Sequence, residues 1–249
     1  KKSGLQMHTD EGSYVVSGKF TGDIKSFSEV DLILFTVKSH DTMEMAKNLQ
    51  AIVKEDALIM TLQNGVDNEE KLVDFFGEKR VLSAATYVQG RIASPGVAEL
   101  RGSTKMVIGS LHESIDAKAK ELVDLFKKAD MSVSYTDKIM EQKWQKFLWN
   151  ITFNPLTALM KVRVGELLHN KHLYKVAEDV LLETLKVAQA LDIDLDEQRM
   201  HQEVFGSNEG AEQHQTSMLQ DRLRGRQMEV ESLSGYIVRK GKELGIETP

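Results

Sequence analysis

The fold class of this chain is decided by the stretch Val30-Asp31-Leu32-Ile33-Leu34-Phe35-Thr36-Val37-Lys38. This continuous apolar run with a polar end is typical of a strand that is buried on both faces of a parallel sheet. Residues 41–53 follow with helical spacing, and residues 57–62 form a second buried strand. Residues 68–76 are helical in pattern, and the next strand is expected over residues 80–85. This alternation predicts an α/β fold with a Rossmann-type doubly wound sheet.

Further strands are expected on both sides of this pattern. The turn Ser94-Pro95-Gly96 separates residues with strand character, which predicts antiparallel strands there. Residues 114–129 have helical spacing. Short extended segments predict strands at residues 13–16, 18–20, 97–100, 106–108 and 133–135.

After residue 137 the pattern is helical, with hardly any strand signal. Helices are expected over residues 138–154, 173–191 and 228–244. The sequence therefore predicts an α/β domain over residues 1–137 and an all-helical domain over residues 138–249. The amphipathic helix over residues 173–191 could pack within its domain or against a second copy, so a homodimer is one arrangement left open.

The composition favours a protein that acts on small molecules. A formal net charge of −6, with acidic and basic residues mixed along the chain, argues against a nucleic-acid surface, which needs a clustered basic face. The absence of Cys excludes disulfides and thiolate metal sites and agrees with a reducing cytoplasm. No stretch approaches the roughly 20 apolar residues of a membrane helix, and the first residues lack the apolar segment of a signal peptide. We therefore expect a soluble, cytoplasmic protein with no membrane or nucleic-acid partner.

A polar stripe runs along the first helix of the second domain. Lys146, Asn150 and Asn154 recur at i, i+4 and i+8 and share one helical face, surrounded by aromatic and aliphatic residues. An unpaired polar group in such a setting costs roughly 1–3 kcal/mol, so the stripe predicts a binding site. The alternative is that the amides bind neighbouring backbone groups while Lys146 reaches solvent along its aliphatic stem. Pro155 is expected to kink or end the helix and to push Asn154 out of the helical conformation.

Two polar residues follow predicted strands of the sheet. Lys38 and Asn64 each lie just beyond a strand's carboxyl end, which is where ligands bind in doubly wound sheets. The alternatives are a solvated strand end for Lys38 and a simple Asn-Gly turn for Asn64.

A second polar cluster lies near the C-terminus. Ser217 and Gln220 have the spacing of a capping box, and the segment 221–226 has the character of a solvated face with local ion pairs. Glu229 lies among apolar residues and needs a cation or hydrogen-bond donors, for which Lys146 is the candidate. The His residues show no metal-ligand spacing, so no metal site is predicted.

In order and spacing, these motifs resemble the ketopantoate reductases (2-dehydropantoate 2-reductases) along nearly the whole chain. The resemblance rests on Thr36-Val37-Lys38, Gln63-Asn64-Gly65, Lys146 with Asn150 and Asn154-Pro155-Leu156-Thr157-Ala158, and Ser217-Met218-Leu219-Gln220-Asp221 with Gly225-Arg226 and Glu229. It implies an N-terminal Rossmann domain, a C-terminal helical domain and a site between them. It also implies NADPH as cofactor and a small 2-oxo acid as substrate.

The resemblance assigns roles by position. It implies that Lys146 is the catalytic acid and that Glu229 is a second catalytic residue, beside substrate and cofactor. The residues implied to bind substrate are Asn64, Asn150, Asn154 and Ser217. Those implied to contact NADPH are Lys38, Asn64 and Glu229.

The chain departs from the family pattern at several points. The strand and Gly-x-Gly-x-x-Gly turn that open the family, with the basic residue that selects NADPH, are absent, and the last family helix is cut short. The sequence is therefore expected to be a fragment whose Rossmann sheet is N-terminally incomplete. Val164, Met228 and Glu231 stand where the family more often has Asn, Thr and Asp, which bears on the choice of substrate.

The leading functional hypothesis is NADPH-dependent reduction of ketopantoate to pantoate, a step of pantothenate and coenzyme A biosynthesis. One alternative is a paralogue that reduces another 2-oxo acid, which a substrate panel would distinguish. Another is a non-catalytic binding module that has lost cofactor binding, for which saturable NADPH binding is the test.

Overall fold

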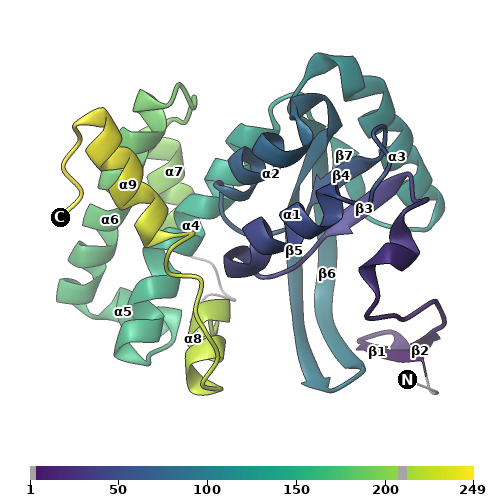
Figure 1. Cartoon of the computed structure of the whole chain (residues 1–249). Coiled ribbons are helices and arrows are strands. Elements are labelled where there is room, and N and C mark those ends of the chain that lie inside the picture. The colour runs from purple at the N-terminus through teal and green to yellow at the C-terminus, as the bar shows by residue number, and fades with distance from the viewer. Residues whose placement is uncertain (1–3, 207–211) are drawn as a thin grey trace. The chain divides into compact units, whose positions relative to one another are not determined.

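The computed structural model describes residues 4–206 and 212–249, which form two compact units (Figure 1). The first unit comprises the described residues up to Thr36, together with Met43–Gln63 and Leu72–Ile139. The second comprises Val37–Thr42, Asn64–Lys71 and the described part of Met140–Pro249. Two short segments that follow strands of the sheet thus pack with the helices of the second unit. The predicted boundary between residues 137 and 138 stays a prediction.

The first unit is built on a mixed sheet of seven strands. Their order is β2-β1-β6-β5-β4-β3, with β7 paired to β6. The pairs β3/β4 and β4/β5 are parallel, β5 and β6 are antiparallel, and β6/β7 is parallel. The strands are β1 (Leu5–Thr9), β2 (Gly12–Val16), β3 (Leu32–Phe35), β4 (Leu58–Thr61), β5 (Val81–Ser94), β6 (Val97–Ser110) and β7 (Val133–Tyr135). The predicted Rossmann-like α/β fold is confirmed.

Three helices connect these strands. They are α1 (Thr42–Gln50), α2 (Asn68–Phe76) and α3 (Asp116–Lys128), and short 3-10 turns lie at Ile24–Phe27, Ser39–Asp41, Glu78–Arg80 and Glu113–Ile115. The α3 residues Ala119 and Val123 pack against Met60, Leu82 and Ile108 of the sheet in one buried cluster. Burial of this apolar area holds α3 on the sheet.

The antiparallel strands differ from the prediction. The expected strands at 97–100 and 106–108 are parts of one strand, β6, and β5 extends far beyond residue 85. The polar residues between the two segments, such as Arg101 and Lys105, are exposed on the strand and do not form a loop. Arg101 and Lys105 pair with Gln89 and Tyr87 of β5 on either side of a register shift, so the strand continues through a polar stretch.

Two other strand predictions were wrong in extent. Residues 18–20 form no strand, and the strand expected over residues 30–38 is reduced to β3. Leu34 of β3 is 45% exposed, so this strand is not buried on both faces. Among the described strands, β3 pairs only with β4 and forms one edge of the sheet, which explains its exposure.

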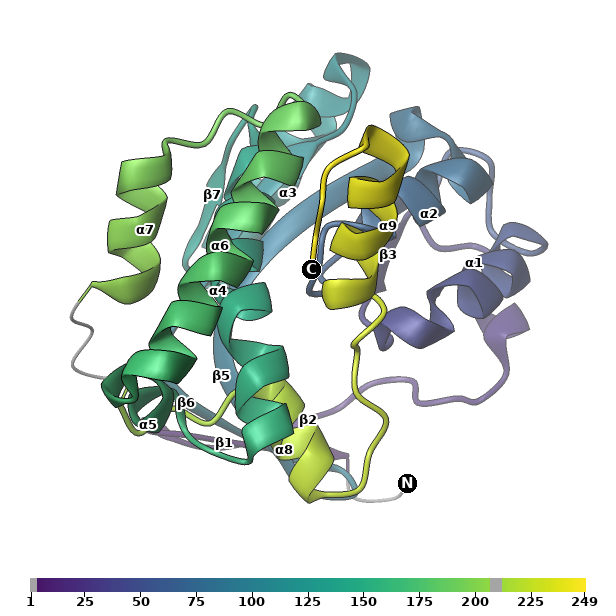
Figure 2. The same ribbon diagram turned by 90° about the vertical axis from the view of Figure 1, so that its left-hand side faces the viewer.

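The described residues of the second unit form helices and connecting segments, with no strand among them (Figure 2). Its helices are α4 (Ile139–Met160), α5 (Val164–His169), α6 (Lys171–Ala190), α7 (Glu197–Phe205), α8 (Ser217–Leu223) and α9 (Ser234–Leu244). None of the described helices is both long and apolar enough to cross a membrane.

Helix α4 is the centre of this unit, because two apolar clusters meet on it. Trp144 and Phe147 pack in one cluster with Tyr236 of α9. Leu148 and Phe153 pack in the other with α6. The apolar face of α6 is therefore buried within its own unit, and a homodimer stays a prediction.

Helix α4 does not end at Asn154, the predicted last residue. It runs on to Met160, and Asn154 remains helical and buried. A Pro inside a helix costs about 3 kcal/mol, but Phe153 and Ala158 on either side are almost fully buried and hold the helix in place. In addition, Thr157 Oγ1 donates to the carbonyl oxygen of Phe153 at 2.7 Å and to that of Asn154 at 3.2 Å.

The last predicted helix begins later than expected. Residues 228 and 229 are irregular, residues 230–233 form a turn, and α9 begins at Ser234. The N–H groups of Leu233 and Gly235 both donate to the carbonyl oxygen of Val230, which closes a turn in place of a helix. Glu229 therefore lies on an irregular segment that precedes α9.

Helix α8 is capped by Thr216, one residue before the predicted cap Ser217. Thr216 Oγ1 accepts from the N–H of Leu219 at 3.1 Å and lies 2.8 Å from Thr157 Oγ1 of α4. Both hydroxyl groups belong to fully buried residues, whereas Ser217 is exposed. Thr216 therefore both begins α8 and fastens it to α4.

We expect Thr216→Val to lower the free energy of unfolding by about 1–3 kcal/mol. The change removes a helix cap, worth about 0.5–2 kcal/mol, and a buried hydroxyl partner of Thr157. Urea denaturation monitored by circular dichroism measures the change. The neighbouring Ser217→Ala is the control and should stay within about 0.5 kcal/mol of the unchanged protein. Equal destabilisation by the two substitutions would contradict the assignment of Thr216 as the cap.

Candidate active site

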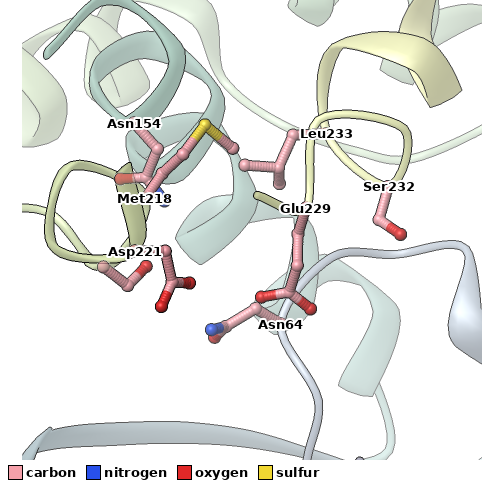
Figure 3. Close-up of a pocket in the computed structure, with 8 residues that line it drawn as sticks. Asn64, Asn154, Met218, Asp221, Glu229, Ser232 and Leu233 are labelled. Carbon is pink, nitrogen blue, oxygen red and sulfur yellow. The ribbon is translucent and has the colours of Figure 1, made fainter. Parts of the chain in front are cut away.

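An open cavity in the second unit brings together polar residues from four segments. The space between its walls, including the part that is open to solvent, is about 300 Å³. Figure 3 shows Asn154, Met218 and Asp221 facing Glu229 and Leu233 across it. The lining residues are Asn64, Asn154, Ser217, Met218, Asp221, Glu229, Ser232 and Leu233. They come from the loop after β4, from α4, from α8 and from the segment before α9.

A cation shared by two carboxylates forms one side of the site. Lys38 Nζ lies 2.7 Å from Asp221 Oδ2 and 3.1 Å from Glu229 Oε2. The second carboxylate oxygen of Glu229 accepts from the backbone N–H of Ser39 at 2.9 Å. The segment Val37–Thr42 is thereby bound to the C-terminal part of the unit.

These contacts keep Lys38 and Glu229 charged. Burial lowers the pKa of Lys38, but the hydrogen bond to Asp221 and the charge of Glu229 outweigh burial and raise the pKa above its ordinary value. Burial raises the pKa of Glu229, but the Ser39 N–H and the charge of Lys38 outweigh burial and lower it. The Glu229 carboxylate is therefore ionised at neutral pH and able to accept hydrogen bonds.

Lys146 loses its proton more readily than an ordinary lysine. Its Nζ donates to Asn64 Oδ1 at 2.9 Å, so it lies against a cavity residue. Burial, and then the charge of Lys143, lower the pKa of Lys146 from 10.5 to about 8. An ammonium group with this pKa can give up a proton at neutral pH far more readily than a solvated lysine.

Asn64 is itself held in place by its own loop. The backbone oxygen of Asn64 accepts from Asn68 Nδ2 at 2.9 Å, and Thr42 Oγ1 donates to Asn68 Oδ1 at 2.9 Å. Gly65 has a φ of +90°, a backbone conformation that residues with a side chain rarely adopt, and this permits a sharp change of chain direction. The predicted Asn-Gly turn is confirmed, and it presents the Asn64 amide to Lys146.

Asn154 has a buried acceptor that a ligand could satisfy. The residue is 4% exposed and lines the cavity, and its Oδ1 has no hydrogen-bond partner within the described residues. A buried acceptor without a donor costs roughly 1–3 kcal/mol, so a ligand N–H or O–H at this position would bind favourably. Asn150, one turn earlier on the same face of α4, is half-buried and is not among the residues that line the cavity.

Two sequence predictions about this site were wrong. The carboxylate of Glu229 pairs with Lys38, a different cation from the predicted Lys146. Asp221 belongs to no solvated face, because it is only 7% exposed and pairs with Lys38. Asp221 lies three residues after the apolar Met218. This spacing was the available sequence signal of its burial, since residues at i and i+3 share a helical face.

The polar side chains of the candidate site suit an organic ligand. Among the residues that the structure describes, no group of three or more His, Asp or Glu side chains is arranged to hold a metal ion. Lys38, Asn64 and Glu229 provide an ammonium group, an amide and a carboxylate, which fit the ribose and carboxamide groups of a nicotinamide nucleotide.

Comparison with known sequences gives a consistent result. The family described as "Ketopantoate reductase PanE/ApbA" matches residues 1–113, and its C-terminal counterpart, "Ketopantoate reductase PanE/ApbA C terminal", matches residues 138–249. The chain is 30% identical to a 2-dehydropantoate 2-reductase of Archaeoglobus fulgidus, over 98% of this chain and 82% of that protein. It is 31% identical to the enzyme of the same name from Aquifex aeolicus, over 93% of this chain and 79% of that protein.

Solved structures agree with these matches. A PanE/ApbA family ketopantoate reductase from Ralstonia eutropha is 29% identical, with a TM-score of 0.88 over 99% of this chain and 80% of that one. A D-mandelate dehydrogenase bound to NADH and anilino(oxo)acetate is 25% identical, with a TM-score of 0.91 over 100% of this chain and 81% of that one. On this evidence the chain belongs to the ketopantoate reductase family.

Proposed function

We propose that this protein reduces 2-dehydropantoate (ketopantoate) to pantoate with NADPH, a step of pantothenate and coenzyme A biosynthesis, with Lys146 as the general acid. The observation that carries the proposal is the contact between Lys146 Nζ and Asn64 Oδ1, with a Lys146 pKa of about 8. Relatives named 2-dehydropantoate 2-reductase support the choice of reaction.

In the proposed reaction, Lys146 acts on the carbonyl oxygen of the substrate. When bound, the reduced nicotinamide supplies the hydride that adds to the carbonyl carbon. Negative charge then grows on the oxygen, and the Lys146 ammonium group stabilises this charge and transfers its proton to form the hydroxyl group. The neutral amine regains a proton from solvent. Asn64 orients the ammonium group by accepting one of its hydrogen bonds.

The remaining site residues hold the substrate and the cofactor. The buried amide of Asn154 is proposed to bind a polar group of the substrate, with Asn64, Asn150 and Ser217 as further contacts and Ser217 at its carboxylate end. The ionised Glu229 is proposed to accept from a substrate hydroxyl group and to act beside the cofactor. Lys38, Asn64 and Glu229 are the proposed NADPH contacts. Residues 1–137 are proposed as the dinucleotide-binding domain and residues 138–249 as the substrate domain.

A second candidate is the reduction of another 2-oxo acid. For this candidate, the similarity to a D-mandelate dehydrogenase with bound NADH favours an aromatic 2-oxo acid as the substrate and NADH as the cofactor. Met218 and Leu233 provide apolar surface in the cavity, and Met228 differs from the Thr more common in the family.

A substrate and cofactor panel tests the proposal. Oxidation of NADPH or NADH by the purified protein is measured at 340 nm with ketopantoate, 2-oxoisovalerate and phenylglyoxylate. We expect the highest kcat/KM with ketopantoate and NADPH. A higher value with another 2-oxo acid, or with NADH, would favour the second candidate. No oxidation of either nucleotide, together with no saturable NADPH binding by fluorescence, would instead indicate a non-catalytic module.

A further inference from the structure

A buried ion pair links α4 to the segment that carries Asn64. Lys143 Nζ of α4 is 3.0 Å from Glu69 Oε1 at the start of α2, and both side chains are only 3% exposed. Neither residue lines the cavity. Because removing two charges from water is costly, a buried ion pair adds little net stability over an apolar pair of similar size. Its presence here is better explained by an effect on its neighbours.

The ion pair joins the same two segments that carry Lys146 and Asn64. Lys143 precedes Lys146 by three residues on α4, so the two ammonium groups are neighbours on one helical face. Glu69 follows Asn64 by five residues in the segment Asn64–Lys71. The Lys143–Glu69 contact and the Lys146–Asn64 hydrogen bond are therefore parallel links between α4 and this segment.

The segment has further anchors within the unit. Glu70 accepts from the hydroxyl group of Tyr236 on α9 at 2.8 Å and lies 3.3 Å from Lys240 Nζ. Asp67 pairs with Lys71. Asn64 is thus presented to Lys146 by a segment that is fixed at several points. Glu69 anchors this segment to α4, the helix that carries Lys146.

We infer that the Lys143–Glu69 ion pair is a positioning device for Lys146: it holds Asn64 against the Lys146 ammonium group, and its buried cation promotes loss of the Lys146 proton. The catalytic consequence rests on the proposed function, whereas the electrostatic effect on Lys146 does not. Glu69 pairs with Lys143 at 3.0 Å, and Lys143 lies one helical turn before Lys146 on α4.

The charges around Lys146 support this assignment. Burial is the first cause of the low Lys146 pKa, and the charge of Lys143 is the second. The other ionisable groups on neighbouring segments have partners of their own: Asp67 with Lys71, Glu70 with Tyr236 and Lys240, and Lys38 with Asp221 and Glu229. Removing the Lys143 charge should therefore raise the Lys146 pKa, by about one unit for like charges at this helical spacing.

Two readouts on three variants test the inference. The double variant Lys143→Met/Glu69→Gln removes both charges and keeps similar side-chain volumes, and Lys143→Arg keeps the cation. Lys143→Gln removes the cation but keeps a hydrogen-bond donor for Glu69. It replaces the double variant if circular dichroism shows that the double variant does not fold. The readouts are the pH dependence of kcat/KM and the pH dependence of Lys146 labelling by acetic anhydride, quantified by mass spectrometry.

We expect labelling of the unchanged protein and of Lys143→Arg to have a midpoint near pH 8, where kcat/KM also begins to fall as the acid loses its proton. Both midpoints should rise by about one pH unit in the charge-removing variants. An unchanged labelling midpoint in those variants would overturn the inference. A shifted labelling midpoint with an unchanged kcat/KM profile would support the effect on Lys146 and would count against Lys146 as the general acid.

Discussion

Replacing Lys146 with alanine is expected to lower kcat by about 10²–10⁴-fold, the usual size of a general-acid contribution. The change removes both the charge that stabilises the developing oxyanion and the proton that the product hydroxyl group needs. Steady-state NADPH oxidation with saturating ketopantoate measures the effect. Near-normal kcat in this variant would remove Lys146 from the mechanism.

A matched control separates this chemical effect from a general loss of charge. Lys186 of α6 is an exposed lysine in the same unit, so Lys186→Ala should leave kcat within about twofold. Near-UV circular dichroism should be the same for both variants, because Lys146 belongs to neither apolar cluster that packs on α4. A similar loss of kcat in Lys186→Ala would show that the assay responds to charge or stability and not to the site.

Replacing Glu229 with glutamine is expected to lower kcat/KM by roughly 10–150-fold. The change keeps an oxygen that can accept from the Ser39 N–H, but it removes the negative charge that faces Lys38 and the cavity. A hydrogen bond to a charged group contributes about 1.5–3 kcal/mol, and the fold-change follows from that range. Initial rates at subsaturating ketopantoate give kcat/KM directly.

Glu231 provides the control for this second variant. It lies two residues from Glu229, but its side chain is 85% exposed and pairs with Arg239 at 2.8 Å. Exposed ion pairs contribute about 0–1 kcal/mol, so Glu231→Gln should leave kcat/KM nearly unchanged. Equal effects of the two substitutions would contradict a specific role for the Glu229 carboxylate.

The sequence pattern alone was sufficient to predict the elements that have a regular arrangement of apolar residues. The helix α2 begins and ends at the predicted residues 68 and 76, and α6 agrees to within two residues at its start and one at its end. Both have a regular apolar face that packs on one side only, so 3.6-residue periodicity identifies them. The strand β4 is similarly clear because all four of its residues are buried.

Elements that depend on distant partners were predicted less well. Residues 101–105 have no strand pattern of their own, and the pairing of Arg101 and Lys105 with β5 makes this stretch part of β6. Pro155 would end an isolated helix, yet α4 continues because its flanks are buried on both sides. In each case the packing free energy outweighs local preference, and a single sequence does not contain that information.

Some residues of the candidate site were likewise predictable from the sequence, and others were not. The stripe of Lys146, Asn150 and Asn154 was visible because its spacing is helical, and the turn at Asn64 because it is Asn-Gly. The pairing of Lys38 with Asp221 and Glu229 was not visible, since these contacts span 183 and 191 residues. Two acidic residues near the C-terminus and one basic residue near the start of the chain give no local signal of proximity.

The central claim is that Lys146 donates the proton in the reductive step, and a single-turnover measurement tests it most directly. NADPH oxidation is followed by stopped flow at saturating ketopantoate, with the unchanged protein and with Lys146→Ala. We predict that the observed rate constant falls by about 10²–10⁴-fold in the variant while NADPH binding is retained. An unchanged single-turnover rate constant, with NADPH bound, would contradict the claim.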